Sequence, residues 1–531
     1  MKKIIALDIG SSAVKACAFE FDGDIRLRYS WIENIGLYSP KPGYAEHNPQ
    51  EVWKAVCDSI QNILAHTGIK KEEIELISIC SQAQCVVLVD KNGAALTPIY
   101  NSQDGRAVDS FRKYYSNGIQ IADLNIFKVL GCLLSTGFLP GSAKDPVFKY
   151  KWAQDHLPEV YEKTYKWLDI KDYIICCMTG EFATTRDNAH AYTIYDSRKN
   201  RGRWGKLSSK IFRVDMEKLP RVVESGCILG GLTEESATQT GLLAGTKVIG
   251  GIIDSTGVQY GSGAVEAGEA MVYWGTSGWL GTITNIAFVD PIYKMGALAT
   301  AQEGIYHYYS NLDSAGISYQ WLKEHIIKDD VGLFDSPGTS VSEDVIYNRM
   351  DQMIKEIPAG SDGVMYAPWI TGCRAPMEAS DIGGMFLNIK NSMDKRHLIR
   401  AVVEGICYHY RLLREKTFGI VGRPEILRFV GGGAKSDEIA QILADITGCK
   451  IEVPKNPQDA GAYGAAIMGF YVLEKGEFSL AEMAHKQKAE KTFAPIVENQ
   501  ILYNKYYKVY KQLYGRNKKI LSALTAITEK R

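Results

Sequence analysis

Residues 4–21 read IIALDIGSSAVKACAFEF, and residues 271–280 read MVYWGTSGWL. Each stretch consists of an apolar run, a turn of Gly, Ser or Thr, and a second apolar run. This pattern predicts two strands joined by a tight turn, and the alternation in the first thirty residues indicates a β-meander. Because the second stretch lies about half the chain beyond the first and repeats its pattern, we expect two similar lobes.

The rest of the chain mixes strands with helices. Residues 51–65 and 398–416 place apolar side chains at helical spacing, so the fold class is predicted to be α/β. A chain of 531 residues exceeds what one hydrophobic core usually serves, which favours two lobes with a cleft between them. A glycine-rich stretch at 250–263 is the expected hinge. The predicted lobes are therefore 1–262 and 263–531, and the segment after Tyr503 is predicted to be a terminal docking helix.

Composition argues against several classes of protein. Lys plus Arg and Asp plus Glu number 61 each, so no net charge favours nucleic acid or an anionic membrane as a partner. Asp8 interrupts the apolar run that a signal peptide would need, and no apolar stretch approaches the ~20 residues that span a bilayer. The 11 cysteines lack any C-x-x-C pair, and the nine histidines form no zinc-binding pattern. These features predict a cytoplasmic enzyme with reduced thiols that acts on small molecules.

Three glycine-containing motifs carry the chemistry. Asp8 precedes a Gly-Ser-Ser turn whose N–H and hydroxyl donors suit a phosphate, and its carboxylate could hold hydrated Mg²⁺. Residues 275–278, Gly-Thr-Ser-Gly, offer the same donors again. Residues 429–437 read FVGGGAKSD, a strand ending in glycines that leave room for a flat ligand at a helix start. Each motif alone is equally an ordinary turn or helix cap.

Taken together, in this order and separation, the motifs resemble the FGGY carbohydrate kinase family of the actin-like ATPase superfamily. The resemblance spans nearly the whole chain and is closest to xylulokinases. It implies two actin-like ATPase (ribonuclease H-like) lobes with a catalytic cleft between them, and transfer of the γ-phosphate of ATP to a sugar hydroxyl. Further matching segments are residues 42–46, 104–106, 146–152, 171–173, 179–181, 372–376, 400–405 and 460–466.

The resemblance also implies roles for individual residues. Residues 250–254 match the family's G-G-x-x-D, so Asp254 is expected to be the catalytic base that takes the proton of the attacking hydroxyl. Asp8 matches the position linked to Mg²⁺, through water, with ATP as co-substrate. The residues that the resemblance places at the nucleotide are Ser11, Ser12, Lys15, Gly275, Thr276, Gly316, Gly432, Gly433 and Asp437.

The sequence departs from its relatives where they contact the sugar. Many of them carry Gln-Met-His-Gly or Gln-Arg-Glu-Thr, whereas residues 82–85 here are Gln-Ala-Gln-Cys. The expected substrate contacts are Gln82, Ala83, Gln84, Asp104 and Arg106, although an Asp–Arg ion pair on a loop is an equally good interpretation of the last two. A ketopentose such as xylulose is the leading acceptor, with gluconate, other ketoses and polyols as alternatives.

Two other classes of protein share these phosphate turns. A chaperone-like or filament-forming ATPase would use them to drive conformational change, but it needs no base aimed at an alcohol. A non-catalytic sugar sensor would keep the fold without turnover. Asp8, Asp254 and both turns favour an active kinase over each alternative. The sequence leaves the assembly open, a homodimer included.

Overall fold

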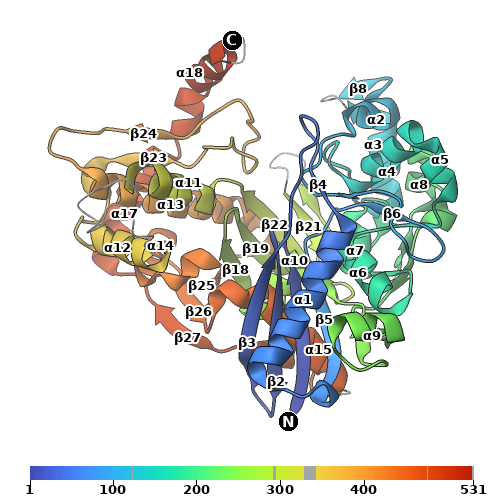
Figure 1. The fold of residues 1–531 in the computed structure, drawn as a ribbon. Coiled ribbons are helices and arrows are strands. Elements are labelled where there is room, and N and C mark those ends of the chain that lie inside the picture. Colours follow the sequence, from blue (N-terminus) through green and yellow to red (C-terminus); the bar gives the residue numbers. More distant parts are fainter. Residues whose placement is uncertain (122–123, 291–294, 328–342, 475, 529–531) are drawn as a thin grey trace.

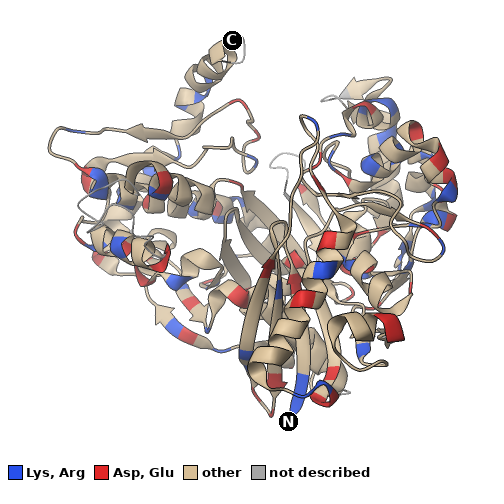
Figure 2. Cartoon of the chain, viewed as in Figure 1, with Lys and Arg blue, Asp and Glu red and all other residues tan. Residues whose placement is uncertain are grey.

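The computed structural model describes the whole chain apart from residues 122–123, 291–294, 328–342, 475 and 529–531. Two lobes lie side by side, with the N-terminal half drawn in blue and green and most of the C-terminal half in yellow to red (Figure 1). Each lobe is built on one large β-sheet. Acidic and basic residues are interspersed over both lobes (Figure 2), as the equal numbers of the two charges suggest.

The N-terminal sheet has seven strands. Its first three form the predicted meander, in which β2 pairs antiparallel with both β1 and β3, while β5 runs parallel to β1. The order is β15-β16-β5-β1-β2-β3, and β17 also pairs with β5. The bounds are Lys2–Ile9 (β1), Ala13–Phe21 (β2), Ile25–Asn34 (β3), Ile74–Ser81 (β5), Ile228–Gly231 (β15), Lys247–Ile249 (β16) and Ile252–Ile253 (β17).

The C-terminal sheet repeats this plan. Strands β18, β19 and β22 form an antiparallel meander, and β25 runs parallel to β18 as β5 does to β1. This correspondence confirms the prediction of two similar lobes. The order is β20-β21-β22-β19-β18-β25-β26-β27. The bounds are Ala270–Trp274 (β18), Gly278–Thr284 (β19), Val289–Asp290 (β20), Met295–Ala299 (β21), Tyr306–Leu312 (β22), Ile426–Val430 (β25), Lys450–Pro454 (β26) and Ala489–Phe493 (β27).

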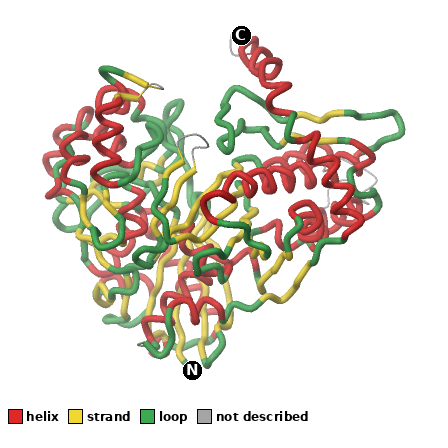
Figure 3. The backbone as a smooth tube through the Cα atoms, turned by 180° about the vertical axis from the view of Figure 1, so that it is seen from behind, coloured by secondary structure: helices red, strands yellow, loops and turns green. Residues whose placement is uncertain are grey.

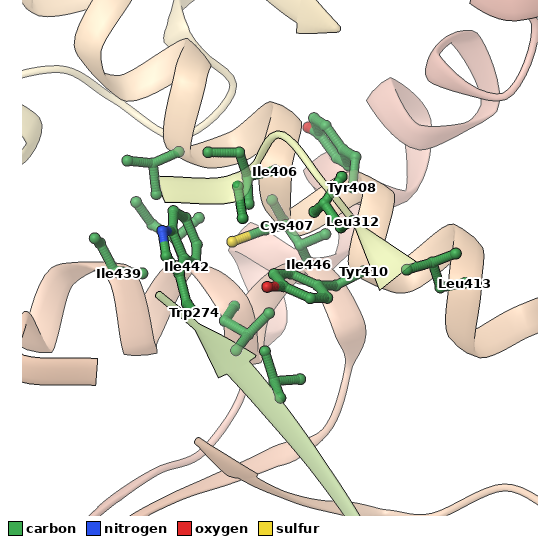
Figure 4. Packing of buried hydrophobic residues seen from close by; sticks show 14 of the residues in the cluster. Trp274, Leu312, Ile406, Cys407, Tyr408, Tyr410, Leu413, Ile439, Ile442 and Ile446 are labelled. Carbon is green, nitrogen blue, oxygen red and sulfur yellow. The ribbon is translucent and has the colours of Figure 1, made fainter. Parts of the chain in front are cut away.

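Helices cover both sheets, as the view from behind shows (Figure 3). Helix α1 (Pro49–Thr67) packs on β2 and β3, and α13 (Lys395–Val421) packs on β19 and β22. Both confirm helices predicted from apolar spacing. Helix α14 (Asp437–Thr447) packs on α13 and β26. Trp274 at the end of β18 lies among the apolar side chains of α13 and α14 that form this lobe's core (Figure 4).

Two helices cross between the lobes. Helix α15 (Ala460–Leu473) comes from the C-terminal half, yet it packs on β1 and β5 of the N-terminal sheet. Helix α10 (Asp254–Ser262) packs on α15 and contacts β18 and β25 of the other sheet. The glycine-rich stretch expected to be a hinge is therefore a strand followed by a helix. The division at residues 262 and 263, and the hinge motion itself, stay predictions.

A helical layer extends the N-terminal lobe and has its own apolar cluster. That cluster includes apolar residues of α4 (Pro146–His156). The apolar side chains of α6 (Ile170–Thr179) belong instead to the cluster of the N-terminal sheet, and α7 (Arg186–Ala191) contacts β17 and β21. The other helices of the chain are α2 (Val108–Phe111), α3 (Ile126–Thr136), α5 (Pro158–Lys163), α8 (Lys206–Phe212), α9 (Glu234–Thr240), α11 (Ala315–Leu322), α12 (Glu343–Lys355), α16 (Leu480–His485), α17 (Val497–Tyr510) and α18 (Leu513–Thr528).

Short strands complete the fold at its periphery. They are Glu46–His47 (β4), Val87–Val89 (β6), Ile99–Tyr100 (β7), Gln120–Ile121 (β8), Leu124–Asn125 (β9), Lys166–Leu168 (β10), Ala183–Thr185 (β11), Tyr195–Asp196 (β12), Arg203–Trp204 (β13), Arg221–Val223 (β14), Met365–Ala367 (β23) and Met385–Leu387 (β24).

The C-terminal tail is helical, as predicted. Helix α17 docks on the C-terminal lobe through three buried tyrosines, whereas α18 projects from the molecule (Figure 1). Within the described residues, no helix is both long and apolar enough to cross a bilayer. All 11 cysteines lie within the described residues, and none of them forms a disulfide there.

Candidate active site

The two predicted phosphate turns occupy equivalent positions. Each follows the first strand of its meander, between β1 and β2 or between β18 and β19. In the first turn the N–H of Gly10 donates to the carbonyl oxygen of Ala13 (2.9 Å). In the second turn the N–H of Gly275 donates to the carbonyl oxygen of Ser277 (2.9 Å). Two cavities, of about 530 and 610 Å³, adjoin these turns and share Tyr273 and Thr276 in their walls. The second turn therefore lies where the cavities meet.

The smaller cavity, here the glycine cavity, brings together five of the residues predicted at the nucleotide. These are Gly275, Thr276, Gly316, Gly432 and Gly433. A Cβ at Gly432 would meet no protein atom within 4 Å, so this glycine faces open space.

An aromatic wall lies elsewhere in the glycine cavity. The stacked rings of Tyr319 and Tyr347, with centroids 5.8 Å apart, line it. An open glycine floor and an aromatic wall suit a flat, uncharged ring system such as a nucleobase.

Three predicted nucleotide residues lie outside both cavity walls. Lys15 pairs with Asp459 (Nζ to Oδ1, 2.7 Å), and Asp437 pairs with Lys491 (Oδ1 to Nζ, 2.7 Å). Ser12 is exposed beyond the first turn. Their nucleotide role stays a prediction, because the structure gives the two charged residues protein partners and places Ser436 in the wall in place of Asp437.

The larger cavity, here the Asp254 cavity, holds the predicted base and metal residue together. Asp8, Gly10, Ser11 and Asp254 all line it. Asp254 opens helix α10 directly after β17, which pairs with the end of β5.

Gly251 allows this placement of Asp254. Its φ is +70°, and a Cβ there would lie 2.3 Å from the carbonyl oxygen of Ile79. The Gly-Gly pair of the motif thus lets the chain pass close to β5 before the carboxylate emerges.

The surroundings of Asp254 favour its neutral form. The carboxylate opens to the cavity, but protein surrounds the recess, and this burial raises its pKa to about 7. The N–H of Ser255 donates to Oδ1 (2.6 Å) and lowers the pKa, whereas the negative charges of Asp8 and Asp187 raise it. Asp254 is therefore a carboxyl group whose pKa is shifted toward neutrality.

Gln82 and Gln84 line the same cavity, as predicted for substrate contacts, and so does Ala83. The Gln82 side chain is held in a network, since its Nε2 donates to the carbonyl of Gly10 (3.1 Å) and its Oε1 accepts from Asn101 (2.9 Å). Gln84 has a φ of 67°, which is uncommon outside glycine. Buried Lys149 donates to its carbonyl oxygen (2.9 Å) and supports this conformation.

Asp104 and Arg106 lie apart from the Asp254 cavity. The Arg106 guanidinium bonds to both Asp104 carboxylate oxygens at 2.8 Å and to Glu46. It also lies over the rings of Tyr44, Tyr100 and Trp152. The structure thus favours the ion-pair interpretation of these two residues, and their contact with a sugar stays an unsupported prediction.

Other residues of the Asp254 cavity were given no role from the sequence. Gln103 neighbours the predicted Asp104, and Arg374 lies in a matched segment, so position in the chain offered a weak signal for these two. Ser102 is adjacent to Gln103, and the remainder come from segments that lie far from these in the sequence. The lining residues without a predicted role include Ser102, Gln103, Phe138, Asp187, His190, Trp279, Tyr309 and Arg374.

Comparison with known proteins decides the family. The model of the N-terminal domain of the FGGY family of carbohydrate kinases matches residues 3–260, and that of the C-terminal domain matches residues 270–473. The chain belongs to the FGGY family of carbohydrate kinases. Like other members of that family, it is a phosphotransferase with an alcohol group as acceptor, and its two lobes have the actin-like ATPase architecture.

Relatives of this FGGY kinase are named for more than one sugar substrate. A xylulose kinase of Bacillus subtilis is 26% identical over 99% of both chains. A gluconokinase of the same organism is also 26% identical, over 89% of this chain and 88% of its own length. The crystal structure of ligand-bound xylulose kinase from Lactobacillus acidophilus superposes with a TM-score of 0.83 over 99% of this chain and 100% of that one, at 23% identity. The comparisons therefore show a sugar kinase and leave its sugar open.

Proposed function

We propose that this kinase transfers the γ-phosphate of ATP to a hydroxyl of a ketopentose such as xylulose. The observation that carries the proposal is that two cavities share Tyr273 and Thr276 in their walls, one cavity lined by glycines and aromatic rings and the other by Asp254. ATP in the first cavity would direct its phosphates past the second turn toward an alcohol in the other. The xylulose kinases among the full-length relatives support the choice of acceptor, and gluconate, another ketose or a polyol are the alternatives.

Asp254 is the proposed base. A sugar hydroxyl is a weak nucleophile, and a carboxylate within hydrogen-bond reach can take its proton as the bond to phosphorus forms. The cavity brings Asp254 near the first phosphate turn without giving its carboxylate a cationic side-chain partner among the described residues. An unpaired carboxylate with a raised pKa suits a proton acceptor.

Asp8 is proposed to hold Mg²⁺ through water. Within the described part of the chain, no three His, Cys, Asp or Glu side chains gather into a metal cage. Mg²⁺ at phosphoryl-transfer sites is usually held by one or two carboxylates together with the substrate phosphates, and Asp8 beside the Gly-Ser turn fits that arrangement. When bound, Mg²⁺ would neutralise phosphate charge.

The raised pKa of Asp254 predicts how activity depends on pH. The base works only when it is ionised, so kcat/KM should rise with pH through the pKa and fall about tenfold per unit below it. Because water reaches the carboxylate, we expect this acid limb above pH 4 and no higher than about 7. A pH profile with a saturating co-substrate measures it. A flat profile from pH 4 to 8, with the protein still folded, would contradict the assignment.

Thr276→Val should weaken the use of ATP. The substitution keeps the shape of the side chain but removes a hydroxyl from the wall that the two cavities share. Loss of one hydrogen bond to a charged phosphate predicts a roughly tenfold lower kcat/KM for ATP. Steady-state kinetics with ATP varied would show it. Unchanged ATP kinetics in a normally folded variant would mean that this turn does not face the phosphates.

The acceptor is best found with a panel. ADP release from Mg-ATP should be stimulated by one or a few members of a set of ketopentoses, ketohexoses, polyols and sugar acids, xylulose foremost. Product analysis should show one phosphate ester per ADP. If no acceptor accelerates ADP release above the rate in water alone, the proposed transfer is wrong.

A further inference from the structure

His190 is an unusual part of the Asp254 cavity wall. It lies on helix α7, is 4% exposed and lines the same cavity as the proposed base. Its Nδ1 lies 2.8 Å from the Ser197 hydroxyl, whereas its Nε2 is buried without a partner among the described residues. The ring of Phe138, which also lines the cavity, packs 4.6 Å from the imidazole. One ring nitrogen thus has a partner within the protein, and the other has none among the described residues.

Two neighbouring contacts fix Ser197 in turn. Its carbonyl oxygen accepts hydrogen bonds from the hydroxyl of Tyr306 (3.0 Å) and from the guanidinium of Arg186. Tyr306 lies on β22 of the C-terminal sheet, so both lobes contribute to holding this imidazole in place. A histidine positioned so firmly can serve to select a ligand by hydrogen-bond geometry.

The imidazole is neutral at neutral pH. Burial and the positive charge of Arg186 lower the pKa of His190 to about 4. Among the described residues that line the cavity, Arg374 alone carries a permanent positive charge, and its Nε lies 3.3 Å from Asp313. Three carboxylates, those of Asp8, Asp187 and Asp254, share the same cavity. The acidic groups of the wall therefore outnumber its one cation.

We infer that His190 Nε2 hydrogen-bonds a hydroxyl of the acceptor, and that the acidic cavity wall favours a neutral ketose or polyol over a sugar acid. The inference rests on the proposed function and narrows its substrate. A hydroxyl both donates and accepts, so it satisfies a neutral imidazole in either tautomer. A carboxylate only accepts, and in this wall it would meet other carboxylates without an unpaired cation. A phosphoryl acceptor without a hydroxyl at this place would leave Nε2 unpaired and would lose this hydrogen bond. His190 would therefore help to determine specificity.

Two substitutions separate this role from simple packing. His190→Asn can keep a polar partner for Ser197, as Nδ1 does now, but cannot reach the position of Nε2. His190→Gln extends an amide toward that position. With the best neutral acceptor, kcat/KM should fall about 10- to 100-fold in the asparagine variant and recover in large part in the glutamine variant. The KM for ATP should stay within about twofold of wild type in both.

His397→Asn is the matched control. His397 is 7% exposed at the start of α13, where its Nδ1 lies 3.1 Å from the backbone nitrogen of Asp394, and it lines neither cavity. Its substitution should leave the ratio of kcat/KM between acceptors unchanged. Thermal unfolding of all variants shows whether each is folded, and calorimetric titration of the acceptor with a nonhydrolysable ATP analogue provides a readout that does not depend on turnover.

The outcomes are distinct. Wild-type kinase that prefers gluconate to every neutral sugar and polyol would overturn this inference while leaving the kinase proposal intact. Equal losses with all acceptors, or no loss in a folded His190→Asn variant, would make His190 an ordinary packing residue. Failure of every acceptor with the wild-type protein would instead reject the proposed function. Asparagine and glutamine variants that differ as expected, with the control unchanged, would support the selection of a hydroxyl.

Discussion

Replacing Asp254 by asparagine is expected to lower turnover about 10²–10⁴-fold while ATP affinity stays near that of wild type. That range is what a general base typically contributes, since positioning and charge neutralisation carry most of the remaining acceleration in phosphoryl transfer. Asparagine keeps the shape and can still accept from the N–H of Ser255, which bonds Oδ1 at 2.6 Å. It cannot take a proton. Single-turnover ADP release with the best acceptor measures the effect on the chemical step.

Asp8→Asn is the control for this variant. Asp8 shares the cavity with Asp254 but lies at the end of β1, beside the first phosphate turn. If it holds Mg²⁺ through water, its substitution should raise the Mg²⁺ concentration needed for half-maximal rate, a change that Asp254→Asn should not produce. Near wild-type turnover in Asp254→Asn would remove Asp254 from the role of base.

Gly464→Ala is expected to destabilise the protein by about 1–3 kcal/mol, the usual cost of overpacking a tight interior. Helix α15 meets α10 at backbone contact, and a Cβ at Gly464 would lie 2.0 Å from the carbonyl oxygen of Gly257. The helices must separate to admit the methyl group. Since α10 carries Asp254 and α15 packs on β1, separation should also lower activity. Thermal or denaturant unfolding gives the stability change.

Gly419→Ala is the same type of substitution, but its effect on the free energy of unfolding is expected to have the opposite sign. Gly419 lies on an exposed part of α13, and a Cβ there would meet no atom within 4 Å. Alanine in an exposed helix is favoured over glycine by roughly 0.5–1 kcal/mol, so this variant should be neutral or more stable. If both variants behaved alike, close helix contact would not be the reason for glycine at position 464.

Much of the fold could be predicted from the sequence because its signals are local. The apolar runs on either side of the turns after Asp8 and at Gly275 predicted a β-meander and a second pair of strands, and the structure pairs those strands as expected. Helical spacing located α1 and α13 to within a few residues. These periods depend only on which side chains face a core, so a single sequence reveals them.

Local signals were weaker for the site. The Gly-Gly-x-x-Asp pattern indicated Asp254 through its resemblance to the family's motif, and the structure shows that the backbone passes close to β5 at Gly251. Asp104 and Arg106 carried an ambiguous signal, since charged pairs serve structure as readily as binding. Sequence alone could not show that the Arg106 guanidinium lies over three aromatic rings from separate segments.

Two related lobes, two glycine-containing turns between strands and a carboxylate after a Gly-Gly pair could all be recognised in the sequence. Which side chains share a cavity with that carboxylate depends on the folded structure. His190, Phe138 and Trp279 lie far apart in sequence and line one cavity with Asp254. His190 on α7 and Phe138 in the loop before α4 belong to the N-terminal half of the chain, whereas Trp279 lies on β19 of the C-terminal sheet. The fold brings all three to one cavity. The periodicity of the sequence does not predict which distant residues come together, because their proximity results from the packing of whole elements against one another.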